Sequence, residues 1–238
     1  TAAGRALRVA NTEIGVAGLT FRSISAGTPS FTTGNGIELD NTGVGLNNGG
    51  LTVTGNGPTP AFTGGVIRRK SGADGTTTAG IGIYLNSTKS PTFHRMQFFS
   101  FDNSAILGRN VSGFQIHDSA IDSAGTTVGV NEGPLVFGLP GTSGVNGLLG
   151  QAIIRNTQIT GGIQHNVAFY NQSGAMSLQL DDTTGVPGTC LVGFNSTSTG
   201  GHGLLLQLEG TATGTATVQQ CRARDNRDRG MSISLTDT

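Results

Sequence analysis

Short runs of alternating apolar and polar residues recur along the whole chain, and they constrain its fold more than any other feature. Each run is about four to six residues long, which is the length of a β-strand with one apolar face. Many runs follow a glycine, whose backbone turns sharply without a Cβ clash. The clearest runs are Gly36–Leu39, Leu51–Thr54, Gly82–Leu85, Phe114–His117, Ala175–Leu180, Gly203–Leu208 and Met231–Leu235. The pattern predicts an all-β protein with many turns.

Asparagines separate these runs at a recurring interval. Asn tolerates the left-handed backbone conformation, and stacked Asn side chains form hydrogen-bonded ladders. A coil of about 24 residues holds three short strands and three turns, so the chain supplies roughly nine or ten coils. The sequence therefore predicts a right-handed parallel β-helix, as a single domain over residues 1–238. The marking asparagines are Asn11, Asn41, Asn86, Asn110, Asn131, Asn156, Asn195 and Asn226.

An antiparallel sandwich or barrel is the rival fold. It would need a hairpin turn between consecutive strands, and Asn-Gly is the strongest signal for such a turn. Asn-Gly pairs, such as those that begin at Asn35, Asn56 and Asn146, are few for so many strands. Since no apolar stripe with helical spacing runs far along the chain, an α/β fold is disfavoured as well.

Composition excludes some classes of partner. The 14 basic and 14 acidic residues cancel, so no basic surface is expected to bind nucleic acid. The apolar stretches are too short to span a membrane. The chain starts at Thr1 without Met and ends within an alternating run, which indicates a processed or excised piece of a longer protein.

The segments Gly34–Gly43 and Gly49–Gly55 carry a resemblance to a known superfamily. They resemble the pectin-lyase-like right-handed parallel β-helices, and in particular the Gly/Asn/Thr-rich repeats of bacterial surface and secreted proteins. The resemblance implies the fold and an extracellular or cell-surface location. That superfamily includes polysaccharide lyases, glycoside hydrolases, phage tailspikes and adhesins, so it leaves function open.

One constellation points to an enzyme. Asp181 and Asp182 are followed by a glycine-flanked His202, and this resembles polygalacturonase-like hydrolases. The resemblance implies that the two carboxylates act as general acid and base, with His202 orienting them. However, the family's upstream Asn-Thr-Asp reads Asn156-Thr-Gln158 here, so one carboxylate is missing. The Asp pair also follows one strand whereas His202 precedes another, so we expect different corners of the coil and assign no catalytic residue.

Cys190 and Cys221 each lie five residues before an asparagine. If Asn195 and Asn226 mark equivalent positions, the two cysteines stack on adjacent coils within bridging distance. In a secreted chain they would then pair, whereas in a cytosolic one they would be two small buried residues.

Neither a metal nor a cofactor is expected. The four histidines, His94, His117, His165 and His202, are too widely spaced to suggest a zinc site. Glu38 and Asp40 alternate along one strand, but two carboxylates are too few for calcium.

Aromatic residues offer little for a sugar-binding cleft. The chain has no Trp, and its two tyrosines are Tyr84 and Tyr170. The phenylalanines are expected inside the coil, including the cluster of Phe93, Phe98, Phe99 and Phe101.

The ends of a β-helix are unpaired edge strands, which pair with another chain unless they are capped. Neither end of this sequence carries a recognisable cap. We therefore expect a structural or adhesive module of an extracellular assembly, either a surface adhesin segment or a filament-forming subunit. Its partners would be further copies of itself, or a surface polysaccharide or protein. A polysaccharide-active enzyme and a trimeric phage tailspike segment are the alternatives.

Overall fold

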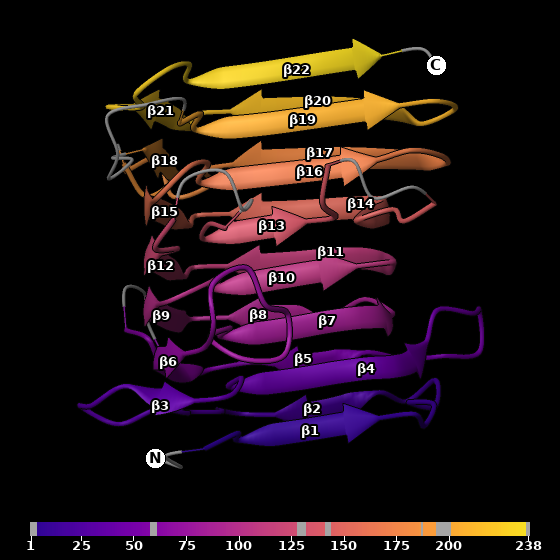
Figure 1. Cartoon of the computed structure of the whole chain (residues 1–238), viewed down its shortest axis with the longest axis vertical. Helices are drawn as coiled ribbons and strands as arrows, with labels where there is room; N and C mark the ends of the chain where they lie inside the picture. Colours follow the sequence, from indigo (N-terminus) through magenta and orange to yellow (C-terminus); the bar gives the residue numbers. More distant parts are fainter. Residues whose placement is uncertain are drawn as a thin grey trace.

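A computed structural model describes residues 4–57, 61–127, 132–140, 144–186, 188–193 and 201–236. Within these ranges the chain forms strands and turns and no helix. The strands lie in three parallel sheets, stacked along a rod with the first strand at one end and the last at the other (Figure 1).

Each coil contributes one strand to each sheet in turn. The first sheet contains β1 (Leu7–Ala10), β4 (Ile37–Gly43), β7 (Ile83–Thr88), β10 (Ile106–Arg109), β13 (Leu135–Phe137), β16 (Val167–Asn171), β19 (Leu204–Glu209) and β22 (Met231–Thr236). The second contains β2 (Leu19–Phe21), β5 (Leu51–Val53), β8 (Thr92–His94), β11 (Val111–His117), β14 (Leu148–Arg155), β17 (Ala175–Asp181) and β20 (Thr213–Gln219). The third contains β3 (Thr32–Thr33), β6 (Gly65–Ser71), β9 (Met96–Phe101), β12 (Ala120–Ala124), β15 (Gln158–Gly162), β18 (Leu191–Gly193) and β21 (Arg222–Arg224).

The coil is right-handed. In Figure 1 the chain rises from its N-terminus while first-sheet strands run left to right in front and second-sheet strands run right to left behind. This is the hand expected when parallel strands are joined by crossover connections. The predicted fold class, an all-β parallel β-helix, is therefore confirmed.

The described residues form seven complete coils and the first strand of an eighth, fewer than the nine or ten expected. Equivalent first-sheet positions are as close as 23 residues, from Ile83 to Ile106, and as far apart as 46, from Ile37 to Ile83. The expected spacing was too short because loops such as 44–50 and 72–82 project from the coil without adding a strand to it.

The core is a set of apolar columns along the rod axis. Because each strand pairs in register with the next coil, alternate residues stack on their counterparts and face inward. Phe93, Phe114, Phe137 and Phe169 form a run of ring contacts, with centroids 4.9 to 6.2 Å apart. Phe99 is an exception to the predicted Phe core, because its position on β9 faces outward and Arg68 lies over its ring.

The asparagines do not mark one corner. Asn11 and Asn110 take positive φ angles after first-sheet strands, and Asn41 does so within β4, whereas Asn156 follows a second-sheet strand. Asn226 lies after the third-sheet strand β21, where its neighbour Asp225 takes the positive φ. Asn86 instead donates a hydrogen bond to Asp40, and its neighbour Ser87 takes the positive φ. Asn131 and Asn195 lie outside the described residues. The side-chain ladder is therefore short, and one link joins the Asn41 amide to the Asn11 carbonyl at 3.0 Å.

Gly108 provides a test of the column packing. It pairs in register with Phe137, and an added Cβ would collide with the Phe137 ring. We expect Gly108→Ala to lower the free energy of unfolding by about 1–3 kcal/mol, because a packed core resists added volume. Urea unfolding followed by circular dichroism measures it. Gly15→Ala is the control, since a Cβ there meets nothing within 4 Å; equal losses in both variants would contradict the packing.

Candidate functional site

Asp181 and Asp182 lie at the corner between the second and third sheets, where β17 ends. In-register pairing places Asp181 next to Arg155 of β14, and Arg155 next to His117 of β11. His117 pairs in turn with His94 of β8. We call this column of four outward-facing residues, together with Asp182, the polar corner.

Asp181 is held by its neighbours in the polar corner. Arg155 donates from Nε to Oδ1 and from Nη2 to Oδ2, both at 2.9 Å, and Gln179 donates to Oδ2 at 2.8 Å. Burial alone would raise the pKa of the Asp181 carboxyl, but the Arg155 and Gln179 hydrogen bonds outweigh burial and lower it. Asp181 is thus a carboxylate at neutral pH, committed to a two-point ion pair.

Asp182 closes a local turn. Its carboxylate accepts hydrogen bonds from the Thr184 backbone N–H at 2.8 Å and from the hydroxyls of Thr184 and Thr189. Burial would raise the pKa of Asp182 as well, but these donors lower it below its usual value. Such side-chain to backbone bonds are typical of Asp in turns.

His202 lies at a different corner, in the turn that precedes β19 between the third and first sheets. Its ring stacks on His165 with centroids 4.9 Å apart, and its Nδ1 lies 3.4 Å from an Asp228 carboxylate oxygen. The structure therefore keeps the two aspartates together and places His202 apart from them. Gln158 stands where polygalacturonase-like hydrolases have an aspartate, and its amide donates a hydrogen bond to the Gly188 carbonyl.

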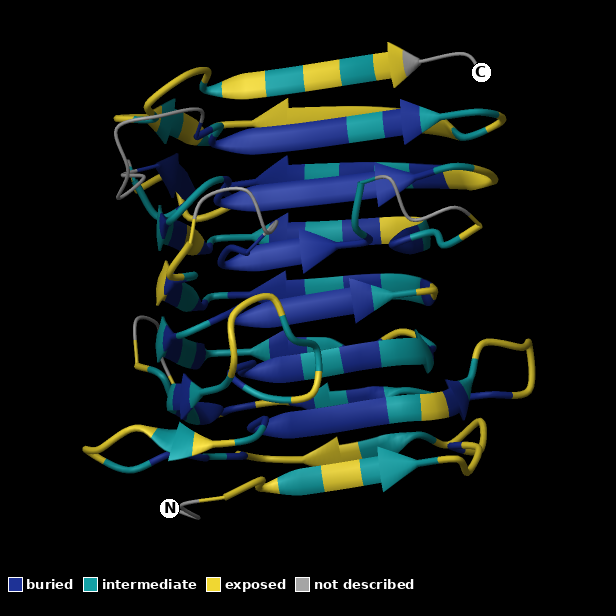
Figure 2. Ribbon diagram, in the orientation of Figure 1, coloured by how far each residue is buried: buried dark blue, intermediate teal, exposed yellow. Residues whose placement is uncertain are grey.

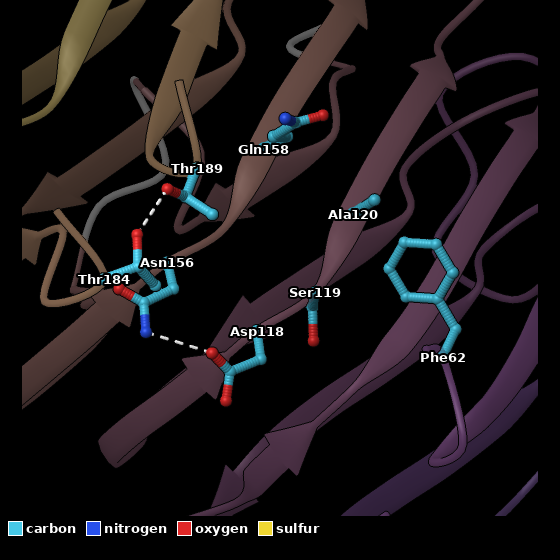
Figure 3. Close-up of a pocket in the computed structure, with 8 residues that line it drawn as sticks. All are labelled: Phe62, Asp118, Ser119, Ala120, Asn156, Gln158, Thr184 and Thr189. Atoms are coloured by element: carbon cyan, nitrogen blue, oxygen red, sulfur yellow. Dashed lines mark hydrogen bonds between the residues drawn. The ribbon is translucent and has the colours of Figure 1, made fainter. Parts of the chain in front are cut away.

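A small cavity of about 120 Å³ opens beside the polar corner (Figure 3). Asn156 lies at one end of it, where its amide donates to the Asp118 carboxylate at 3.0 Å. The hydroxyls of Thr184 and Thr189 are 2.7 Å apart beside it, and Phe62 lies at the other end. The cavity is well below the roughly 300 Å³ at which ligand pockets begin. The polar side chains around it already make hydrogen bonds within the protein.

Neither carboxylate has the raised pKa that a general acid for glycoside cleavage uses. A general acid in such a reaction is a carboxyl whose pKa is raised, so that it still holds a proton near neutral pH. The pKa values of Asp181 and Asp182 are both lowered. The arrangement at this corner is that of structural ion pairing and turn closure.

Glu132 is a buried carboxylate that the sequence analysis did not single out. It accepts hydrogen bonds from the backbone N–H of Gly75 and Thr126, and so joins the loop that follows β6 to the loop that follows β12, two coils further along. Burial raises its pKa, although these backbone donors oppose the rise. Its flanking sequence carries no motif, so only the structure identifies this role.

The two stacked histidine pairs were also missed from the sequence. His94 and His117 stack at 4.6 Å, and His165 and His202 at 4.9 Å. Each pair joins neighbouring coils, although its members are 23 or 37 residues apart in sequence. Burial, followed by the neighbouring imidazole, lowers the pKa of both His117 and His165 to about 4.

Cys190 and Cys221 form a disulfide, with their Cα atoms 4.8 Å apart. They stand directly before β18 and β21, whose first residues, Leu191 and Arg222, are register partners. The bridge therefore links two successive coils at the corner next to Asp182.

The described part of the chain contains no group of three or more His, Cys, Asp or Glu side chains placed to hold a metal ion. Nor does that part include a helix with the length and apolar character needed to cross a membrane. No family model matches the sequence, and no match was found among curated proteins or solved structures.

The buried histidines should make stability depend on pH. In the unfolded chain they take up protons near the ordinary pKa of 6.5, whereas in the fold His117 and His165 stay neutral down to about pH 4. The unfolded state therefore binds more protons in this interval, and stability falls as pH drops through it. We expect the thermal midpoint to fall from pH 7 to pH 4.5, and to fall less in His117→Gln. A midpoint that rises on acidification would contradict this account.

The disulfide should contribute measurably to stability. It closes a loop between cysteines 31 residues apart, and the chain-entropy model assigns such a loop about 3–4 kcal/mol. We expect reduction with dithiothreitol to lower the free energy of unfolding by about that amount. The double variant Cys190→Ser/Cys221→Ser should be unaffected by reductant, and an equal response of both proteins would show that the loss has another cause.

Proposed function

We propose that this chain is a structural or adhesive module of an extracellular or cell-surface assembly, and that its end coils pair with those of a second copy. The observation that carries the proposal is the state of the two ends. At both of them the apolar columns of the core continue into strands that no other described residue covers (Figure 2).

The C-terminal end exposes the continuation of the first-sheet columns. Met231, Ile233 and Leu235 of β22 pair in register with inward-facing leucines of β19. Their exposed fractions are 38%, 59% and 74%. Among the described strands β22 is the last of its sheet, and an uncovered edge strand is a template for another strand.

The N-terminal end presents the complementary edge. Leu7 and Val9 of β1 begin the same columns, since they pair in register with Ile37 and Leu39. Docking β1 of one copy on β22 of another would extend these columns without a break. Such a head-to-tail contact uses two different surfaces and need not close on itself, so repetition produces a filament.

Two further observations support the proposal. A disulfide suits an oxidising compartment such as the cell exterior. The parallel three-sheet architecture supports the inference that the chain belongs to the pectin-lyase-like superfamily. The lowered pKa values of Asp181 and Asp182 favour a scaffold over the polysaccharide-active enzyme.

A charge on the exposed end column tests the contact. We expect the native protein to associate with rising concentration, and Leu235→Lys to weaken that association at least about tenfold, because docking would bury an unpaired ammonium. Sedimentation velocity measures the association, and electron microscopy shows its form. Leu46→Lys is the matched control, since Leu46 is 93% exposed on a lateral loop.

The alternatives give different results. A native protein that stays monomeric at all concentrations contradicts the proposal, more so if it releases reducing sugars from a polysaccharide panel. A closed trimer that is indifferent to Leu235→Lys would favour a tailspike segment instead.

A further inference from the structure

A second cavity, of about 310 Å³, lies on the outer face of the first sheet near its N-terminal end. Arg8 of β1, Glu38 of β4 and Tyr84 of β7 line it, and these three are register partners on successive coils. Thr77 and Thr78 from the loop between β6 and β7 form another wall. The volume lies at the lower end of the roughly 300–1,000 Å³ found for ligand pockets.

The charges around this cavity balance. Glu38 is held by Arg5 and by Arg8, each with a nitrogen 2.8 Å from a carboxylate oxygen. Asp40 accepts a hydrogen bond from the Asn86 amide at 2.8 Å. Two guanidinium groups and two carboxylates therefore leave no net charge, which favours a neutral ligand.

Asn35 also lines the cavity, and its environment is unusual. The residue is 1% exposed, and neither the oxygen nor the nitrogen of its side-chain amide has a hydrogen-bond partner among the described residues. An unsatisfied buried amide costs about 1–3 kcal/mol per missing partner, so native proteins rarely keep one without a reason.

The fold itself does not require an amide at this place. Gly36 bonds to Gly82 on the next coil, which makes Ile81 the equivalent of Asn35. Ile81 is fully buried and apolar. An apolar side chain thus serves the same position one coil further along.

We propose that this cavity binds one residue of a neutral sugar. The Asn35 amide supplies a donor and an acceptor for adjacent hydroxyls after a small rotation of its enclosed side chain. The half-buried Tyr84 ring supplies an apolar face for sugar C–H groups, and the Thr77 and Thr78 hydroxyls provide further polar contacts. This site is independent of the end-to-end contact and lies on the side of the rod, where it stays accessible in a filament.

The probes are methyl glycosides of glucose, galactose and mannose, with galacturonate as the charged comparison. Saturation-transfer NMR on the full chain detects bound sugar, and the side-chain NH₂ signal of Asn35 in the ¹⁵N-labelled protein reports the site. We expect at least one neutral glycoside to bind, with a Kd on the order of 1 mM, and to shift that signal. Galacturonate should bind more weakly.

Asn35→Ala separates binding from folding. It should weaken glycoside binding at least about tenfold, while the thermal midpoint stays unchanged or rises, because the amide makes no internal hydrogen bond. Tyr84→Leu should also weaken binding. The matched control is Asn171→Ala, whose buried amide bonds to Gly147 and Leu148; it should lower the midpoint and leave binding intact.

Several results would contradict the proposal that this cavity binds a neutral sugar. These are an absence of saturation transfer to every neutral glycoside, tighter binding of galacturonate than of the neutral glycosides, or equal glycoside binding by Asn35→Ala and the native protein. None of them would change the concentration-dependent association of the native protein, so failure here is distinguishable from failure of the proposed assembly.

Discussion

In-register pairing between successive coils is the constraint on which the rest of this molecule depends. Each strand bonds through its backbone to the equivalent strand of the coils before and after it, so equivalent residues must stack. Inside the rod this aligns apolar side chains into continuous columns. At the corners it aligns residues that tolerate positive φ, as at Asp118 and Asn156. The environment of a residue is therefore set more by the residues about one coil away than by those beside it in sequence.

The same constraint explains the two polar regions. At the polar corner, stacking places Arg155 between His117 and Asp181, and every carboxylate oxygen of Asp181 finds a donor. The result is a satisfied network, which strengthens the rod and leaves little free for chemistry. On the first sheet, stacking brings Arg8 onto Glu38 in the same way, yet the side-chain amide of Asn35 nearby has no hydrogen-bond partner in the described part of the chain. The contrast makes the cavity beside Asn35 a better candidate for a ligand site than the polar corner.

Sequence reasoning reached the fold because alternation and turn residues are local signals. Runs such as Phe114–His117 predict strands wherever they occur. Because the Asp pair follows one strand and His202 precedes another, the order of strands was enough to place them at different corners of the coil. The coil count failed because an outward loop such as 72–82 has the same Gly- and Thr-rich composition as the turns. The partners of Asp181 and the isolation of Asn35 depend on register between coils. One sequence alone does not specify that register.

The position of the disulfide also determines how the rod would respond to force. Tension applied at the C-terminal strand would peel β22 and then β21 from the stack, one strand at a time. It would then reach Cys221 and pass through the sulfur–sulfur bond directly to Cys190. The strands enclosed between the two cysteines, β18, β19 and β20, would carry no load. The bridge therefore acts as a mechanical bypass, which protects β18, β19 and β20 from being unravelled by pulling.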